Sequence, residues 1–95
     1  MTKTNTNTYA QERIGFYEAR FASETKHQLV TNFNRLASSH GWTAERSYYS
    51  AALTREMQRR GIDLTAIMSN DTGLQTIRYV RVAYDKDSHA LLPIA

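Results

Sequence analysis

The sequence predicts a single α+β domain in which two consecutive amphipathic helices pack on a small antiparallel sheet of three to four strands. Two observations support this prediction. Apolar residues recur at helical spacing over residues 24–60, and after Gly61 the apolar period falls from 3.6 to 2. The expected element order is β-α-α-β-β-β. The 95 residues fit one domain, 9–95, preceded by a Thr/Asn-rich stretch, 1–8, that we expect to be a disordered tail.

The first element, from Ile14 to Phe21, is ambiguous. Its apolar residues Ile14, Tyr17 and Phe21 fit a helical stripe, but the aromatic residues also alternate as in a strand. Gly15 weakens the helical reading, and Ser23 reads as the N-cap of the helix that follows. We therefore predict a strand here, with a helix as the alternative.

The next two elements have clear helical signals. The first helix, over residues 24–39, carries its apolar stripe on Leu29, Val30, Phe33, Leu36 and Ala37. It ends at Gly41, which can take the left-handed conformation. The second helix, over residues 43–60, begins at Thr43 as N-cap and is closed by Gly61. We expect its core side to hold Trp42, Tyr49, Leu53 and Met57.

The last third of the chain is predicted to be a strand meander. Strands are expected over residues 62–69 and 74–84, joined by the turn 69–73, whose Asn, Asp and Gly tolerate positive φ. A polar turn, 85–89, then precedes the apolar segment 90–95. Because that segment contains a proline, it is an edge strand or a docked tail.

Composition excludes several classes of protein. The chain has no cysteine, so disulfides, thiolate metal sites and cysteine nucleophiles are absent. No apolar run reaches the roughly 18–20 residues of a membrane span, and the N-terminal stretch lacks the apolar region of a secretory signal. We expect a cytoplasmic protein that does not bind membranes.

No motif in the sequence indicates catalysis. The three histidines, His27, His40 and His89, share no metal-ligand spacing, and no nucleophile motif, phosphate-binding loop or dinucleotide fingerprint occurs. We therefore predict a small non-enzymatic binding module with no metal and no cofactor.

The middle of the chain is the most basic part. Residues 42–61 hold four arginines against two glutamates, a net charge of +2 within a total of +3. Tyr48, Arg55 and Arg59 fall on one side of the predicted helix 43–60, with Ala52 between them. This pattern suits phosphate and base-edge contacts with DNA or RNA. The candidate nucleic-acid-binding residues are Tyr48, Arg55 and Arg59, with Arg46 and Arg60 on phosphates.

Strand 74–84 supplies a secondary candidate. Its alternation places Val80 and Val82 inward and leaves Tyr79 and Arg81 as an exposed pair. A winged helix-turn-helix is the alternative fold, with helix 43–60 as the recognition helix and residues 62–84 as the wing.

The alternative function is a protein-interaction or self-assembling accessory domain with no nucleic-acid role. Ten aromatic residues, six of them tyrosine, occur in this short chain, and tyrosine is enriched at interfaces. The segment 90–95 is positioned to add to the sheet edge of a partner or of a second copy. The predicted partners are therefore DNA or RNA, with a protein partner or a homo-oligomer as the alternative.

Overall fold

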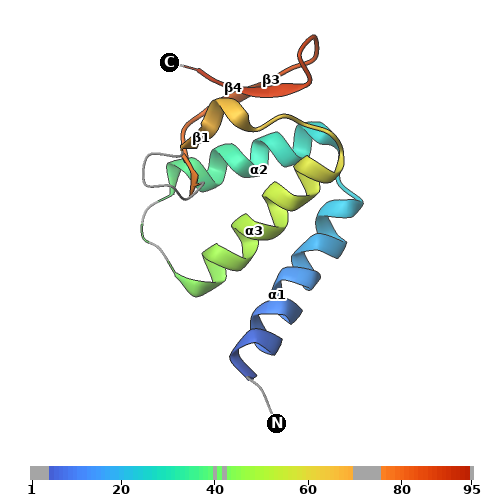
Figure 1. Ribbon diagram of the computed structural model, residues 1–95, viewed down its shortest axis with the longest axis vertical. Helices are drawn as coiled ribbons and strands as arrows, with labels where there is room; N and C mark the ends of the chain where they lie inside the picture. The colour runs from blue at the N-terminus through green and yellow to red at the C-terminus, as the bar shows by residue number, and fades with distance from the viewer. Residues whose placement is uncertain (1–4, 40, 42, 70–75, 95) are drawn as a thin grey trace.

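Three consecutive helices are followed by short strands in the computed structural model, which describes residues 5–39, 41, 43–69 and 76–94 (Figure 1). The helices are α1 (Asn5–Ala22), α2 (Lys26–Ser38) and α3 (Ala44–Arg59). After a 3₁₀ turn, η1 (Thr65–Ile67), come β1 (Met68–Ser69), β2 (Thr76–Ile77), β3 (Val82–Asp85) and β4 (Ala90–Pro93). The α+β class is confirmed, although the element order and the strand count fit only roughly.

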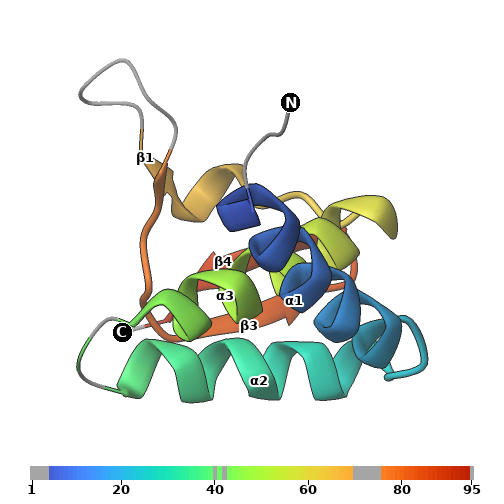
Figure 2. The same cartoon turned by 90° about the horizontal axis from the view of Figure 1, so that it is seen from below.

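The strands form two antiparallel pairs instead of one sheet of three to four strands. β1 pairs with β2, and β3 pairs with β4 so that Ala83 faces Leu92 and Tyr84 faces Leu91. Asp63 adds an isolated parallel bridge to Ala90 on the outer edge of β4. Figure 1 shows the β3–β4 hairpin at the end of the molecule opposite the start of α1, and Figure 2 shows β3 running alongside α2.

The strand predicted from Ile14 to Phe21 is wrong, because these residues belong to the helix α1. Ile14, Tyr17 and Phe21 form the inward side of α1 and pack on the core. Gly15 is tolerated because it lies on the exposed side, where an added Cβ would meet no atom within 4 Å. α1 also begins at Asn5, inside the stretch predicted to be a tail.

The predictions for the other two helices are confirmed to within two residues. α2 is capped by Thr25 instead of Ser23. The Thr25 hydroxyl accepts from Gln28 N–H, and the side-chain oxygen of Gln28 accepts from Thr25 N–H. α3 has the predicted cap, with the Thr43 hydroxyl accepting from Arg46 N–H at 3.1 Å. Gly61, which follows α3, has a φ of 82°.

The predicted long strand 74–84 is replaced by two short ones, and the chain between β2 and β3 is irregular. Strand 62–69 is likewise reduced to η1 and β1. The segment 90–95 contributes β4, an edge strand whose last residue is the proline. The predicted turn 69–73 and the predicted core residue Trp42 lie outside the described residues, except for Ser69.

The core is built from side chains of all three helices, η1 and the β3–β4 hairpin. Its fully buried large side chains are Phe21, Phe33, Leu29, Leu53, Met57, Ile67, Leu91 and Val82. Of the predicted core side of α3, Leu53 and Met57 are buried and Tyr49 packs against them. Among the described residues, no helix is long and apolar enough to cross a membrane.

Candidate nucleic-acid interface

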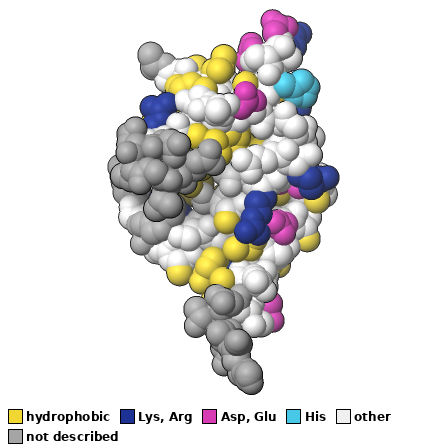
Figure 3. Space-filling view, in the orientation of Figure 1, with side chains coloured by type: hydrophobic (Ala, Val, Ile, Leu, Met, Phe, Trp, Pro, Cys, Tyr) yellow, Lys and Arg dark blue, Asp and Glu magenta, His cyan; other side chains and the backbone are white. Residues whose placement is uncertain are grey.

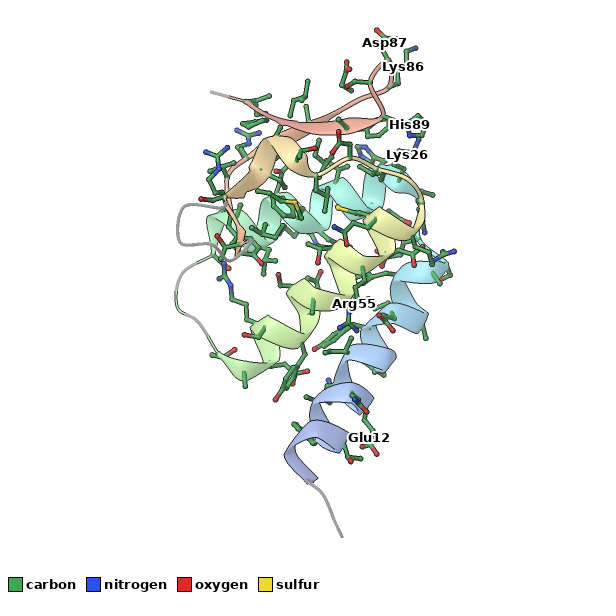
Figure 4. All side chains as sticks on the ribbon, viewed as in Figure 1. Glu12, Lys26, Arg55, Lys86, Asp87 and His89 are labelled. Atoms are coloured by element: carbon green, nitrogen blue, oxygen red, sulfur yellow. The ribbon has the colours of Figure 1, made fainter. Side chains whose placement is uncertain are left out.

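The side of α3 selected by the sequence faces α1. Ala52 is fully buried there, and the Tyr48 ring makes an edge-to-face contact with Tyr9 at 6.0 Å between centroids. Arg55 Nη1 lies 3.5 Å from Oε2 of Glu18 on α1. Figure 4 shows the Arg55 side chain between the two helices. Arg55 keeps most of its exposure, whereas Tyr48 is partly covered by α1.

Arg59 and Arg60 share a buried carboxylate, that of Glu56, which is only 4% exposed. Arg59 donates to its two oxygens from Nε at 3.0 Å and from Nη2 at 2.5 Å. Arg60 Nε donates to Oε2 at 2.6 Å. These bonds, those from Arg59 first, lower the pKa of Glu56 although burial opposes the shift. A buried carboxylate requires such partners, so both guanidiniums serve the fold.

Arg60 and Arg46 also bond the carbonyl ends of helices. Arg60 Nη2 donates to the backbone carbonyls of Phe21 at 2.9 Å and Glu24 at 2.7 Å. Arg46 Nη2 donates to the carbonyl of Leu36 at 2.8 Å, near the end of α2. The last carbonyls of a helix lack partners within the helix and attract cations. Arg46 and Arg60, the two residues predicted to bind phosphates, are therefore already hydrogen-bonded to carbonyls at or near helix ends.

The sequence-predicted arginines of α3 are thus all engaged within the molecule. In the space-filling view of Figure 3, the cations on this face are scattered, most of them beside acidic side chains, and do not form a continuous basic surface. A polyanion that docked here would have to compete with Glu18 and Glu56 for the same guanidiniums.

The structure separates the secondary pair, Tyr79 and Arg81. Tyr79 packs inward: its ring stacks on Phe33 at 5.7 Å between centroids, and its hydroxyl is hydrogen-bonded to Ser50 Oγ. Its prediction as an exposed residue is wrong, because the irregular chain between β2 and β3 breaks the alternation. Arg81 is exposed as predicted, and its side chain has no partner among the described residues.

Arg81 borders a groove of about 700 Å³ between α2 and β3. The groove is lined by Lys26, His27, Val30, Thr31, Asn34, Arg81, Val82, Ala83, Tyr84, Lys86 and Ile94. A second depression of about 470 Å³ continues it along α2 and is lined by Thr31, Asn34, Arg35, Ser38 and Arg81. We call the two together the α2–β3 groove.

The charge of the α2–β3 groove has one sign. Its basic residues are Lys26, His27, Arg35, Arg81 and Lys86, and no described residue that lines it is Asp or Glu. The side chains of Arg35, Arg81 and Lys86 form no hydrogen bond or ion pair with the described part of the chain. Asp85 at the end of β3 and Asp87 in the β3–β4 turn lie outside the lining. Figure 4 places Lys86 at the tip of that turn.

Lys26 and Tyr84 fix the end of the groove near the start of α2. Lys26 Nζ donates to the Tyr84 hydroxyl at 3.1 Å and lies 4.2 Å from the centroid of its ring. The same hydroxyl is 3.0 Å from Nδ1 of His89 on the hairpin. Figure 4 shows Lys26 and His89 close together. The Tyr84 side chain is therefore held in place by two polar contacts, with Lys26 and with His89.

Of the residues that line this groove, only Arg81 was predicted from the sequence as a candidate contact. The cations on α2 and on the hairpin are separated by more than forty residues, and each occurs singly in the sequence. The sequence feature that could have indicated the groove is the outward side of α2, which holds Lys26, Thr31, Arg35 and Ser38 and no acidic residue.

A second polar cluster lies between α1 and the start of α3. Arg13 and the Tyr17 hydroxyl both donate to Glu45 Oε2, at 2.5 Å each. The pKa of Glu45 is lowered mainly by its hydrogen bond with Arg13 and next by its hydrogen bond with Tyr17. The hydrogen bond with Glu45 in turn raises the pKa of Tyr17. The groups satisfy one another and leave no charge unpaired.

Comparison with known proteins gives no match: no family model, no curated protein and no solved structure is significantly similar to the chain. Within the described ranges, no group of three or more His, Cys, Asp or Glu side chains is placed to hold a metal ion.

Proposed function

We propose that the protein is a small non-enzymatic module that binds nucleic acid through the α2–β3 groove. The observation that carries the proposal is that Arg35, Arg81 and Lys86 line one groove with no acidic residue in its described lining and no side-chain partner among the described residues.

Unpaired cations in a groove are suited to a polyanion. Each phosphate that is neutralised releases bound counterions, and this release supplies most of the sequence-independent affinity for nucleic acid. A cation already bonded to a carboxylate gains less, because its ion pair must be broken first. The groove cations carry no such cost, whereas Arg59 and Arg60 do.

The order of the elements, helices followed by a hairpin, is also that of the alternative fold, a winged helix-turn-helix. In that mode α3 would enter the major groove of a duplex. We favour the α2–β3 groove because the arginines of α3 are bonded to α1, to Glu56 and to helix ends.

The test is a fluorescence-anisotropy titration with labelled DNA and RNA at two salt concentrations. Arg35→Gln with Arg81→Gln should weaken binding by about tenfold or more. Arg55→Gln with Arg59→Gln removes the same two charges from α3 and should change it little. A larger loss in the α3 pair would move the interface to α3, and no binding at low salt would reject the function.

A second candidate, self-association, is favoured by an apolar surface on the hairpin. Ala83 and Leu92 are register partners, and Ile94 lies two residues further along the same side. Leu92 and Ile94 are 40% and 43% exposed. Light scattering over a range of concentrations tests this candidate: a dimer that Leu92→Glu converts to monomer would support it, and a monomer throughout would reject it.

A further inference from the structure

The α2–β3 groove has two chemically different halves. One half, which we call the apolar half, has Val30, Ala83 and Ile94 in its lining, together with Tyr84 and the cations Lys26 and Lys86. The other half, the polar half, is lined by polar residues alone, of which Arg35 and Ser38 belong only to it. Thr31, Asn34 and Arg81 line both halves. A ligand that fits the whole groove therefore needs negative charge along its length and a flat or apolar part beside Val30, Ala83 and Ile94.

Single-stranded nucleic acid has this character, and a duplex does not. In a duplex the bases are stacked and paired inside, so only phosphates and groove edges would face the apolar half. An unpaired strand exposes its bases, which pack on aromatic and apolar side chains while cations follow the backbone. Resting on the proposed function, we infer that the groove selects single-stranded over double-stranded nucleic acid.

The polar half is suited to the phosphates. Hydroxyl groups and arginine are the side chains that most often contact the backbone of nucleic acids. From Lys26 to Arg35 the two halves together follow ten residues of α2, which is about 13.5 Å along the helix axis. At about 3.4 Å of duplex rise per nucleotide, this length accepts more than one nucleotide.

An acidic peptide is the competing occupant, and the edge of β3 argues against its extended form. An extended peptide would add to β3 through main-chain hydrogen bonds. At Val82 these bonds are already made, since the Asn34 side chain donates to the Val82 carbonyl and accepts from its N–H. A strand added here would have to displace Asn34.

The experiment measures anisotropy for four labelled probes: a mixed-sequence single-stranded DNA, its duplex, the same sequence as RNA, and a polyglutamate peptide. We expect the single strands to bind at least about fivefold more tightly than the duplex, since packing one base contributes roughly 1 kcal/mol or more. Equal or tighter binding of the duplex overturns the inference but leaves the proposed function standing.

Two matched variants test the apolar half. Ile94 lines the groove, and Leu92 does not, although the two side chains are similarly exposed. Ile94→Ser should weaken single-strand binding by about fivefold without affecting the duplex, and Leu92→Ser should affect neither. Equal effects of the two variants would overturn the inference. Absence of binding to every nucleic-acid probe overturns the proposed function as well, and preference for polyglutamate identifies an acidic protein as the ligand.

Discussion

The side chain of Asn34 on α2 forms both hydrogen bonds that an added strand would make with Val82 on β3. Nδ2 donates to the Val82 carbonyl at 3.0 Å, and Oδ1 accepts from the Val82 N–H at 2.8 Å. At the opposite edge of the hairpin, Asp63 N–H donates to the His89 carbonyl and the Asp63 carbonyl accepts from Leu91 N–H. The hairpin is thus covered at Val82 on one edge and at His89 and Leu91 on the other, which is one way in which natural sheets protect their edges.

Asn34→Leu should therefore both destabilise the protein and open an edge. Two backbone groups of Val82 lose their partners, so we expect the free energy of unfolding to fall by about 1–3 kcal/mol. Thermal and urea unfolding measure this change, and light scattering reports whether the opened edge self-associates. Thr31→Val, one helical turn earlier, removes a hydroxyl with no bond in the described part of the chain and should stay within about 0.5 kcal/mol.

The groove cations should set the salt dependence of nucleic-acid binding. If Arg35 and Arg81 each neutralise one phosphate of a single strand, the slope of log affinity against log salt should become shallower by about 1.4 in Arg35→Gln with Arg81→Gln. Titrations at four or more salt concentrations give the slope. The variant pair at Arg55 and Arg59 should keep the slope of the unmodified protein. An unchanged slope in the groove pair would show that these arginines do not contact phosphates.

Glu56 should make the stability depend on acidity. Its pKa is lowered in the folded protein by Arg59 and Arg60, so its contribution is present above the unfolded value of about 4.3 and is lost as pH falls through the folded value. Glu56→Gln should lower the free energy of unfolding by about 1–3 kcal/mol at pH 7 and should lose less on acidification to pH 3. Urea unfolding at both pH values measures the difference. Parallel curves for the two proteins would assign the acid sensitivity to other carboxylates.

Two glycines should respond in opposite directions to substitution by alanine. Gly15 lies inside α1 at an exposed position, so Gly15→Ala should stabilise the protein by about 0.5–1 kcal/mol. Gly61 has a φ of 82°, so Gly61→Ala should destabilise it by about 1 kcal/mol, although no atom blocks the new Cβ. The midpoints of thermal unfolding compare the two. Stabilisation by both substitutions would contradict the left-handed conformation of Gly61.

Local signals were sufficient for part of the fold. Thr43 and Gly61 bound α3 because cap hydroxyls and left-handed glycines act on their own neighbours in the chain. α1 was harder, since Tyr17 and Phe21 satisfy a helical and an alternating pattern alike, and only packing against Tyr49 on α3 decides between them. The division of the strands depends on tertiary contacts too, as Tyr79 is held inward by Phe33 and Ser50.

Only the general character of the candidate site, a cluster of basic side chains, could be predicted from the sequence, and its position could not. A helical wheel places Arg55 and Arg59 on one side of α3, but it does not show that α1 lies there with Glu18. Arg35 and Arg81 line the same part of the α2–β3 groove, beside the Asn34 side chain that bonds Val82 on β3. Such a surface has no pattern in the sequence.

Arg60 joins the ends of three helices. Its guanidinium bonds carbonyls at the end of α1 and beside the start of α2, and it shares the Glu56 carboxylate within α3. Fraying of any one of these ends would leave part of this charge network without partners in a low-dielectric site. Amide hydrogens near Phe21, Glu24 and Glu56 should consequently exchange with solvent together, in one cooperative opening with a free energy close to that of global unfolding.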